Sequence, residues 1–166
     1  MKTEQPGLLL FNGKSLLVLL LALLARTLVL AGELPAATDL RNEAEQARRQ
    51  GGPLIILFSR RDCRYCATVR NNYLIPLAAS PDYGRRVVVR QVDQESSAAL
   101  IDFHGQPTSH AAFAASEKIK LVPVVAFFDA SGQQLAAPIV GLRLADFYQS
   151  YLEEAINQSI KKLSLH

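Results

Sequence analysis

The chain has 166 residues, which suffices for one domain with a substantial hydrophobic core but not for two domains of ordinary size. Hydrophobic residues make up 49% of it and charged residues 20%, a balance that excludes a disordered chain and a membrane protein with many spans. Two of its three net positive charges fall in residues 1–31, so the rest of the chain has no basic excess that would indicate a nucleic-acid partner.

Residues 1–31 have the pattern of a secretory signal. Two lysines precede ten consecutive apolar residues, 16–25, and small residues follow around Ala31. Cleavage after Ala31 would release a single domain, residues 32–166. An uncleaved leader would instead anchor the protein, although Arg26 interrupts the apolar run and a spanning helix needs roughly 20 apolar residues. Both interpretations place residues 32–166 outside the cytoplasm, where disulfides persist.

The remaining chain alternates between strand patterns and helix patterns. The run 54–58 is apolar without alternation, which is typical of a central strand covered on both faces. The segment 94–107 lacks a clear periodicity and is expected to be a connecting loop that contains at most one helical turn. We expect strands at 54–58, 87–92, 122–128 and 134–140, and helices at 38–50, 66–79, 108–118 and 144–163. This order predicts an α/β fold with a central mixed four-stranded sheet flanked by helices.

Both cysteines lie where the chain leaves the first predicted strand and enters the next helix. Two residues separate Cys63 from Cys66, so their sulfurs can bond in a tight ring. The N-terminus of a helix presents unpaired N–H groups and partial positive charge, which favours a thiolate at Cys63. Arg61 and Arg64 are close enough in sequence to add to this effect. Cys66, one turn further along, is expected to be more buried and to serve as the resolving thiol.

Other interpretations of the cysteine pair stay open at this point. The pair could form a structural disulfide, contribute half of a copper or zinc site, or be inert. His104 and His110 lie in or beside the long connection and are candidates for a proton shuttle or a metal ligand, although such histidines are more often surface or helix-start residues. The place of the motif between a central strand and a helix favours redox chemistry.

Across about residues 38–163 the chain resembles the thioredoxin superfamily. The apolar strand, the motif Cys63-Arg64-Tyr65-Cys66, the pair Val122-Pro123 opening a strand, and Gly141 before the last helix occur in the family's order. Within the superfamily, the aromatic residue before the second cysteine makes the chain most similar to exported bacterial proteins of the SoxW and DsbC-related kind.

The resemblance implies a periplasmic thiol–disulfide oxidoreductase that acts on protein thiols and disulfides and needs neither an organic cofactor nor a metal. Cys63 would attack a partner disulfide and Cys66 would resolve the mixed disulfide. Tyr65 would be an exposed substrate contact. The bond before Pro123 is cis in the family, which would place the Val122 main chain where it can pair with a bound substrate strand.

Departures from the family bear on the direction of the reaction. Leu57 stands where thioredoxins themselves carry a buried acid, and Arg64-Tyr65 replaces their Gly-Pro. Nearby arginines, including Arg61, favour an oxidant, because a stabilised thiolate favours the reduced form.

The SoxW resemblance instead implies a reductant that takes electrons from a membrane-bound donor and acts in cytochrome maturation or sulfur oxidation. We expect a reductase, and a monomer, since the chain has no room for the dimerisation domain of DsbC-type isomerases. The alternative is a thiol-based binding protein such as a copper(I) chaperone, because copper(I) prefers soft thiolates.

Overall fold

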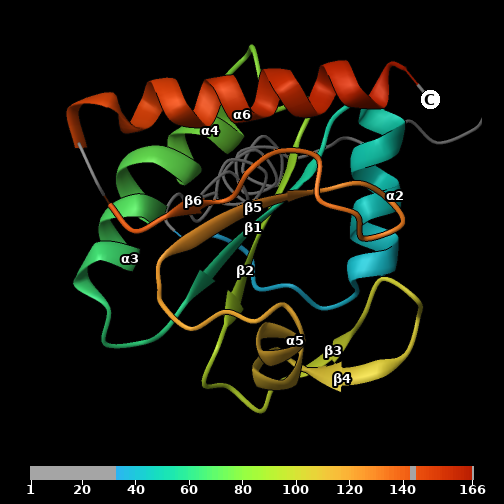
Figure 1. The fold of residues 1–166 in the computed structure, drawn as a ribbon, viewed down its shortest axis with the longest axis vertical. Coiled ribbons are helices and arrows are strands. Elements are labelled where there is room, and N and C mark those ends of the chain that lie inside the picture. Colours follow the sequence, from blue (N-terminus) through green and yellow to red (C-terminus); the bar gives the residue numbers. More distant parts are fainter. Residues whose placement is uncertain (1–32, 143–144, 166) are drawn as a thin grey trace, which may run out of the picture. The chain divides into compact units, whose positions relative to one another are not determined.

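The computed structural model describes residues 33–142 and 145–165 (Figure 1). The predicted signal or anchor, residues 1–31, lies outside the described residues. In chain order the elements are α2 (Leu40–Gln50), β1 (Leu54–Ser59), α3 (Arg64–Val69), the π-helical turn η2 (Arg70–Leu74), α4 (Ile75–Ala79), β2 (Val88–Asp93), β3 (Ala99–Ile101), β4 (Pro107–Ser109), α5 (His110–Ser116), β5 (Val124–Phe128), β6 (Ile139–Val140), the 3₁₀ turn η3 (Ala145–Phe147) and α6 (Tyr148–Leu163).

The main sheet has the strand order β2-β1-β5-β6. β1 pairs in parallel with β2 and antiparallel with β5, so Leu54 lies opposite Val88 on one side and Phe128 on the other. β5 pairs antiparallel with β6. The predicted α/β fold with a mixed four-stranded sheet is therefore confirmed.

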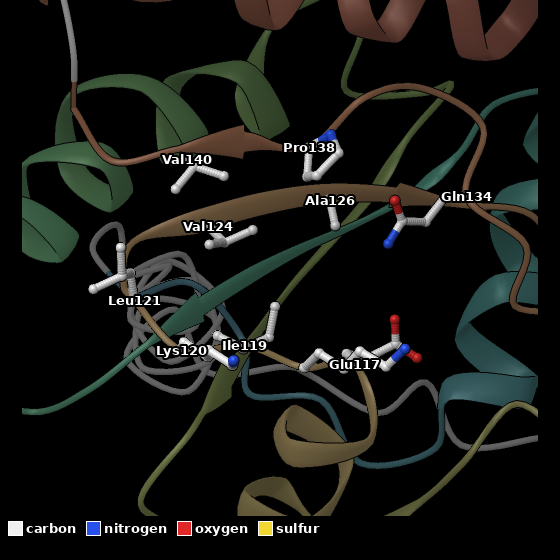
Figure 2. Close-up of a pocket in the computed structure, with 10 residues that line it drawn as sticks. Glu117, Ile119, Lys120, Leu121, Val124, Ala126, Gln134, Pro138 and Val140 are labelled. Atoms are coloured by element: carbon white, nitrogen blue, oxygen red, sulfur yellow. The ribbon is translucent and has the colours of Figure 1, made fainter.

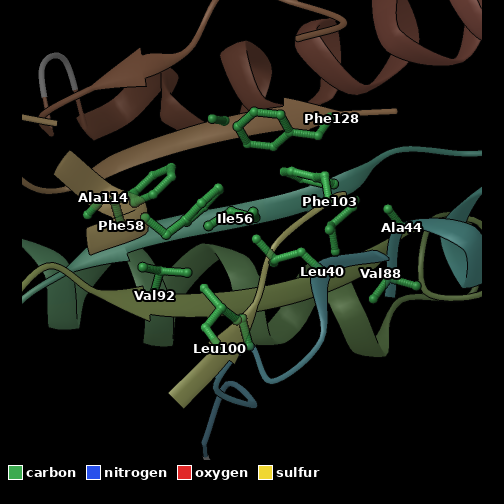
Figure 3. Close-up of a cluster of buried hydrophobic side chains, with 14 of the residues drawn as sticks. Leu40, Ala44, Ile56, Phe58, Val88, Val92, Leu100, Phe103, Ala114 and Phe128 are labelled. Carbon is green, nitrogen blue, oxygen red and sulfur yellow. The ribbon is translucent and has the colours of Figure 1, made fainter. Parts of the chain in front are cut away.

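Side chains of the sheet alternate between two apolar clusters, one on each face. Ile56 and Phe58 of β1 belong to the cluster that α2 and α5 complete, which is shown in Figure 3. Ile55 and Leu57 belong to the opposite cluster, which α3, α4 and α6 complete. Each such fully buried side chain stabilises the fold by about 1.5–3 kcal/mol. Figure 1 shows the resulting layers, with α6 on one side of the sheet and α5 on the other.

The first described helix, α2, has defined signals at both ends. Asp39 caps the N-terminus, because its Oδ1 accepts a hydrogen bond from the Asn42 N–H at 2.9 Å. Gly51 ends the helix with φ 77°, a left-handed conformation that glycine adopts without steric cost, and its N–H donates to the last turn. The apolar residues of α2 are buried in the cluster of Figure 3.

The predicted helix 66–79 consists of three consecutive segments, α3, η2 and α4. Pro76 lies at the start of α4 and has no N–H to donate to the preceding turn. Immediately before it, the Ile75 N–H bonds to the carbonyl of Arg70, five residues back. The wider π-helical turn thus accommodates the proline without ending the helical path, and the helix starts at Arg64, two residues earlier than expected.

The expectation of a loop over 94–107 is wrong in part, because β3 and β4 form a small antiparallel sheet there. Asp102 organises the turn between them, since its Oδ1 accepts hydrogen bonds from the N–H groups of His104 and Gln106. Leu100 and Phe103 insert into the cluster of Figure 3. Strands of three residues are too short to show a period, so only their packing identifies them.

The predicted fourth strand, 134–140, forms only at its two ends. β6 covers Ile139–Val140, and Gln134 makes an isolated bridge to Phe128. Pro138 cannot donate to a strand ladder, which interrupts the pairing between these points. Among the described residues, no helix combines the length and the apolar character needed to cross a membrane.

Tyr148 supplies a pH-dependent test of the packing. It is fully buried against Tyr73, with the ring centroids 4.6 Å apart, and its hydroxyl has no hydrogen-bond partner in the described part of the chain. Burial raises the pKa of Tyr148 well above its usual value, and the nearby Tyr73 adds to the rise. A pKa raised on folding contributes stability below the pKa of the unfolded chain, about 10, and that contribution is lost as the pH rises further.

We therefore predict that Tyr148→Phe unfolds with a free energy equal to that of the wild type, or about 1 kcal/mol higher, at pH 7. Above about pH 10 its free energy of unfolding should fall less steeply than that of the wild type. Urea unfolding across this pH range measures both, with Tyr151→Phe on the exposed side of α6 as the matched control. A clear loss of stability at pH 7 would contradict the absence of a partner for the hydroxyl.

Candidate active site

Cys63 and Cys66 form a disulfide at the start of α3, with their Cα atoms 5.1 Å apart. Cys63 is the N-cap residue of this helix, and its Sγ accepts a hydrogen bond from the Cys66 N–H at 3.0 Å. The sulfur thus occupies the place that a serine or aspartate oxygen takes in ordinary caps. The same N–H and the helix dipole stabilise negative charge on Cys63 when the pair is reduced.

The two sulfurs differ in access. Cys63 is partly exposed, whereas Cys66 is 1% exposed. A partner can therefore reach Cys63 but not Cys66. This asymmetry allows a division into an attacking and a resolving thiol, as the sequence predicts.

Tyr65 and Arg64 form an exposed pair beside the disulfide. The Tyr65 side chain is 53% exposed, as expected for a substrate contact. The Arg64 guanidinium carbon lies 5.2 Å from the centre of the tyrosine ring, and its Nη2 donates to the phenol oxygen at 3.4 Å. The charge of Arg64 is therefore held over the aromatic ring.

Arg61 lies in a polar hollow of about 370 Å³ beside the motif. Three carboxylates, those of Asp62, Asp93 and Glu95, line the same hollow. Within the described residues, neither Arg61 nor Arg64 forms a hydrogen bond with a cysteine sulfur. The contribution of these arginines to the thiolate stays a prediction, and the carboxylates oppose it at Arg61.

Val122 and Pro123 lie at the same end of the sheet as the cysteines. Because β5 runs antiparallel to β1, its first residue, Val124, pairs with Phe58 near the end of β1. The Val122–Pro123 peptide bond is cis, and the Pro123 carbonyl accepts a hydrogen bond from the Gly141 N–H at 2.8 Å. In the described chain, no hydrogen bond engages the Val122 main chain. This is the placement that the family resemblance implies.

The two candidate histidines differ. His110 is the first residue of α5, as a helix-start residue, but it is buried rather than on the surface. Its Nδ1 accepts a hydrogen bond from the Asp93 N–H at 3.1 Å, and its Nε2 lies 2.8 Å from the Ala37 carbonyl oxygen. The tautomer with its proton on Nε2 satisfies both contacts. His110 thus joins three segments of backbone, while His104 is exposed in the turn after β3.

Leu57 is fully buried in the apolar cluster to which α3 contributes, where thioredoxins carry the acid that this sequence lacks. Ser59 follows on the same face of β1, and its buried hydroxyl has no partner among the described residues. Sequence reasoning did not single out this hydroxyl, although strand alternation places it on that face. Within residues 33–142 and 145–165, no three or more metal-ligating side chains gather.

These features define a class of protein, a two-cysteine redox domain on a mixed α/β sheet with a cis-proline at the same end of the sheet as the disulfide. The family described as a thioredoxin-like domain matches residues 40–156, and the chain belongs to it. The protein is thus a thiol–disulfide oxidoreductase of the thioredoxin-like type. None of the curated proteins compared matches the chain.

Two solved structures are similar in fold. Oxidised mitochondrial thioredoxin 3 from Saccharomyces cerevisiae is 16% identical, with a TM-score of 0.50 over 75% of this chain and 93% of that one. A DsbH oxidoreductase is 18% identical, with a TM-score of 0.51 over 79% of this chain and 90% of that one. The superfamily expected from the sequence is confirmed, and the narrower SoxW and DsbC-related kind stays a prediction.

The bridging role of His110 predicts a large and local effect on stability. His110→Phe keeps an aromatic ring at this position but leaves the Asp93 N–H and the Ala37 carbonyl without their partner. We expect the free energy of unfolding to fall by about 2–4 kcal/mol, because unsatisfied buried groups are costly. His104→Phe, at an exposed position, should change it by less than about 0.5 kcal/mol. Urea unfolding of both variants at pH 7 measures this, and equal effects would contradict the bridge.

Proposed function

We propose that the protein is an exported thiol–disulfide oxidoreductase that reduces disulfide bonds in partner proteins. The observation that carries this proposal is the disulfide at the N-terminus of α3, with Cys63 accessible and Cys66 buried behind it. A structural disulfide has no need of such an asymmetric arrangement at a helix N-terminus.

The reaction proceeds in two exchanges that conserve electrons. In the reduced protein the Cys63 thiolate attacks one sulfur of the partner disulfide, the partner S–S bond breaks, and the released partner thiolate takes up a proton. Cys66 then loses its proton and attacks the Cys63 sulfur of the mixed disulfide. This restores the Cys63–Cys66 bond and releases the second partner thiol, so two electrons pass from the protein to the partner.

The partner chain docks across the end of the sheet that holds the disulfide. An extended segment pairs with the Val122 main chain, whose hydrogen-bonding groups have no partner in the described residues. Tyr65 contacts the same segment, because its exposed ring is amphipathic and Arg64 holds one side of it. The partner is a folded or folding protein with an accessible disulfide, of the cytochrome-maturation or sulfur-oxidation type.

The distribution of charge supports a reductase rather than an oxidase. A strong oxidant requires a strongly stabilised thiolate. Here the charge of Arg61 shares its hollow with three carboxylates, and Arg64 lies against the ring of Tyr65. Most of the stabilisation of Cys63 therefore comes from the Cys66 N–H and the helix terminus alone.

The setting of the reaction is part of the proposal. The N-terminal residues 1–31 export the domain to the periplasm or anchor it there, and a membrane-bound donor regenerates the dithiol. The protein acts as a monomer. The Cys63–Cys66 pair is its redox group, without an organic cofactor or metal.

Substitution of each cysteine separates the two exchanges. Cys63→Ser should abolish reduction of a protein disulfide such as that of insulin, because the accessible nucleophile is lost. Cys66→Ser should still attack but accumulate mixed disulfides, which non-reducing electrophoresis after thiol trapping detects. Ser59→Ala, which retains both cysteines, is the control. Full turnover by either cysteine variant would overturn the mechanism.

The alternative function has its own test. Tight stoichiometric copper(I) binding by the wild type, without any reduction of disulfides, would favour a copper(I) chaperone instead.

The equilibrium reduction potential tests the direction. We expect a value near the thioredoxin potential of about −270 mV, measured by thiol trapping against dithiothreitol and glutathione. Arg61→Ala and Arg64→Ala should each lower the potential by no more than about 20 mV, because exposed charges contribute at most about 1 kcal/mol. A value near −120 mV, which characterises strong disulfide donors, would assign the protein as an oxidase.

A further inference from the structure

A groove of about 270 Å³ opens on the face of the sheet that α5 covers, beyond the end of that helix (Figure 2). We call it the α5–β6 groove. One wall is the segment 117–121, which follows α5, and the other is the segment that leads into β6. Apolar side chains line most of it: Ile119, Leu121, Val124, Ala126, Pro138 and Val140.

The groove exposes apolar surface because α5 is short. With seven residues, α5 covers the part of the sheet next to β1 and β2 and ends before β6. Val124 and Ala126 belong to the core cluster on this face, and the groove extends that cluster to the surface. At its rim, Leu121 is 70% exposed and Val140 47% exposed. Contiguous exposed apolar surface with a polar rim is typical of an interaction site.

One end of the groove adjoins the candidate active site. Figure 2 shows Leu121, Val124 and Val140 together at one end, and Glu117 with Gln134 at the other. Leu121 directly precedes Val122, and Val124 pairs with the end of β1 that leads to the cysteines. A polypeptide that pairs with the Val122 main chain can therefore continue into the groove on the α5 side of the sheet.

The charges at the rim select the kind of segment. Lys118 and Lys120 are both exposed on the wall that follows α5. Glu117 is the one carboxylate among the described lining residues. Burial raises the pKa of Glu117, and the neighbouring Gln134 side chain opposes this rise. The charge that faces solvent along this wall is thus positive, which complements an acidic partner.

The size of the groove favours side chains over a cofactor. Sites for small molecules usually enclose about 300–1,000 Å³ and bury most of the ligand. The α5–β6 groove is smaller than this range and open. It matches one or two apolar side chains of a polypeptide whose neighbouring residues remain in solvent.

We propose that the α5–β6 groove binds an apolar segment of the partner protein that also carries aspartate or glutamate residues, while the partner's disulfide lies at Cys63. The inference rests on the proposed function and extends it to substrate selection. The groove anchors the apolar side chains, and Lys118 and Lys120 pair with the acidic ones.

Matched disulfide peptides test this proposal. The two peptides carry the same disulfide, and each has one arm in which apolar and charged residues alternate. They differ only in the charged residue of this arm, which is glutamate in one peptide and lysine in the other. The readout is the rate constant at which each peptide oxidises the reduced full chain. The wild type should react faster with the glutamate peptide by about tenfold, the effect of two exposed ion pairs. The double variant Lys118→Glu/Lys120→Glu should lose or reverse this preference.

The controls separate the groove from the redox site. Arg85→Glu/Arg86→Glu changes the charge equally at exposed residues that precede β2, at the opposite end of the sheet from the cysteines, and should retain the preference. Leu121→Ser should lower the rate constant several-fold for both of these peptides. It should not lower the rate constant for a third peptide in which serines replace the apolar residues of the arm. Reaction of Lys118→Glu/Lys120→Glu with bis(2-hydroxyethyl) disulfide, which carries no charge, should equal that of the wild type.

Each alternative outcome has a defined meaning. If Lys118→Glu/Lys120→Glu prefers the glutamate peptide as strongly as the wild type does, the groove proposal is wrong. The preference would then come from charges near the cysteines. A wild type that shows no preference between the two peptides but self-associates, with the association lost in Lys118→Glu/Lys120→Glu, would also overturn the proposal. The occupant of the groove would then be a second copy of the chain. Failure of the wild type to react even with bis(2-hydroxyethyl) disulfide overturns the proposed function itself.

Discussion

The site depends on one constraint, the confinement of β1 in the centre of the sheet. This strand is buried on both faces and hydrogen-bonded along both edges. Every residue from Leu54 to Ser59 is buried, and the strand pairs with β2 on one side and β5 on the other. A strand held in this way cannot shift register without moving its apolar side chains to the wrong face. The point at which the chain leaves the sheet, four residues before Cys63, is therefore fixed.

The antiparallel pairing of β1 with β5 makes one site out of two distant parts of the chain. The end of β1 delivers the cysteines, and the start of β5 lies beside it with Val122 and Pro123. The hydrogen bond from Gly141 to Pro123 joins β6 to the same corner. The short α5 leaves the opposite face of this corner open, so the groove and the disulfide are neighbours for the same topological reason.

The sequence predicts most of the framework because its main signals are local. The continuous apolar run of β1 and the two-residue spacing of Cys63 and Cys66 can each be recognised without knowledge of the rest of the chain. The contacts that it does not predict join residues far apart. His110 bridges to Ala37 across 73 positions, and β3 and β4 exist through the packing of Leu100 rather than through any period. Arg64 and Tyr65 are adjacent, yet their stacking depends on side-chain conformation that a motif does not specify.

The buried leucine at position 57 affects the second step of the proposed exchange more than the first. The first step needs a thiolate at Cys63, which the Cys66 N–H stabilises directly. The second step needs Cys66 to lose a proton at a buried position, where a charged thiolate is disfavoured. With leucine in place of a buried carboxylate, β1 supplies no base for this proton. We therefore expect resolution to be slower than the first attack, which gives a mixed disulfide time to form contacts along the groove.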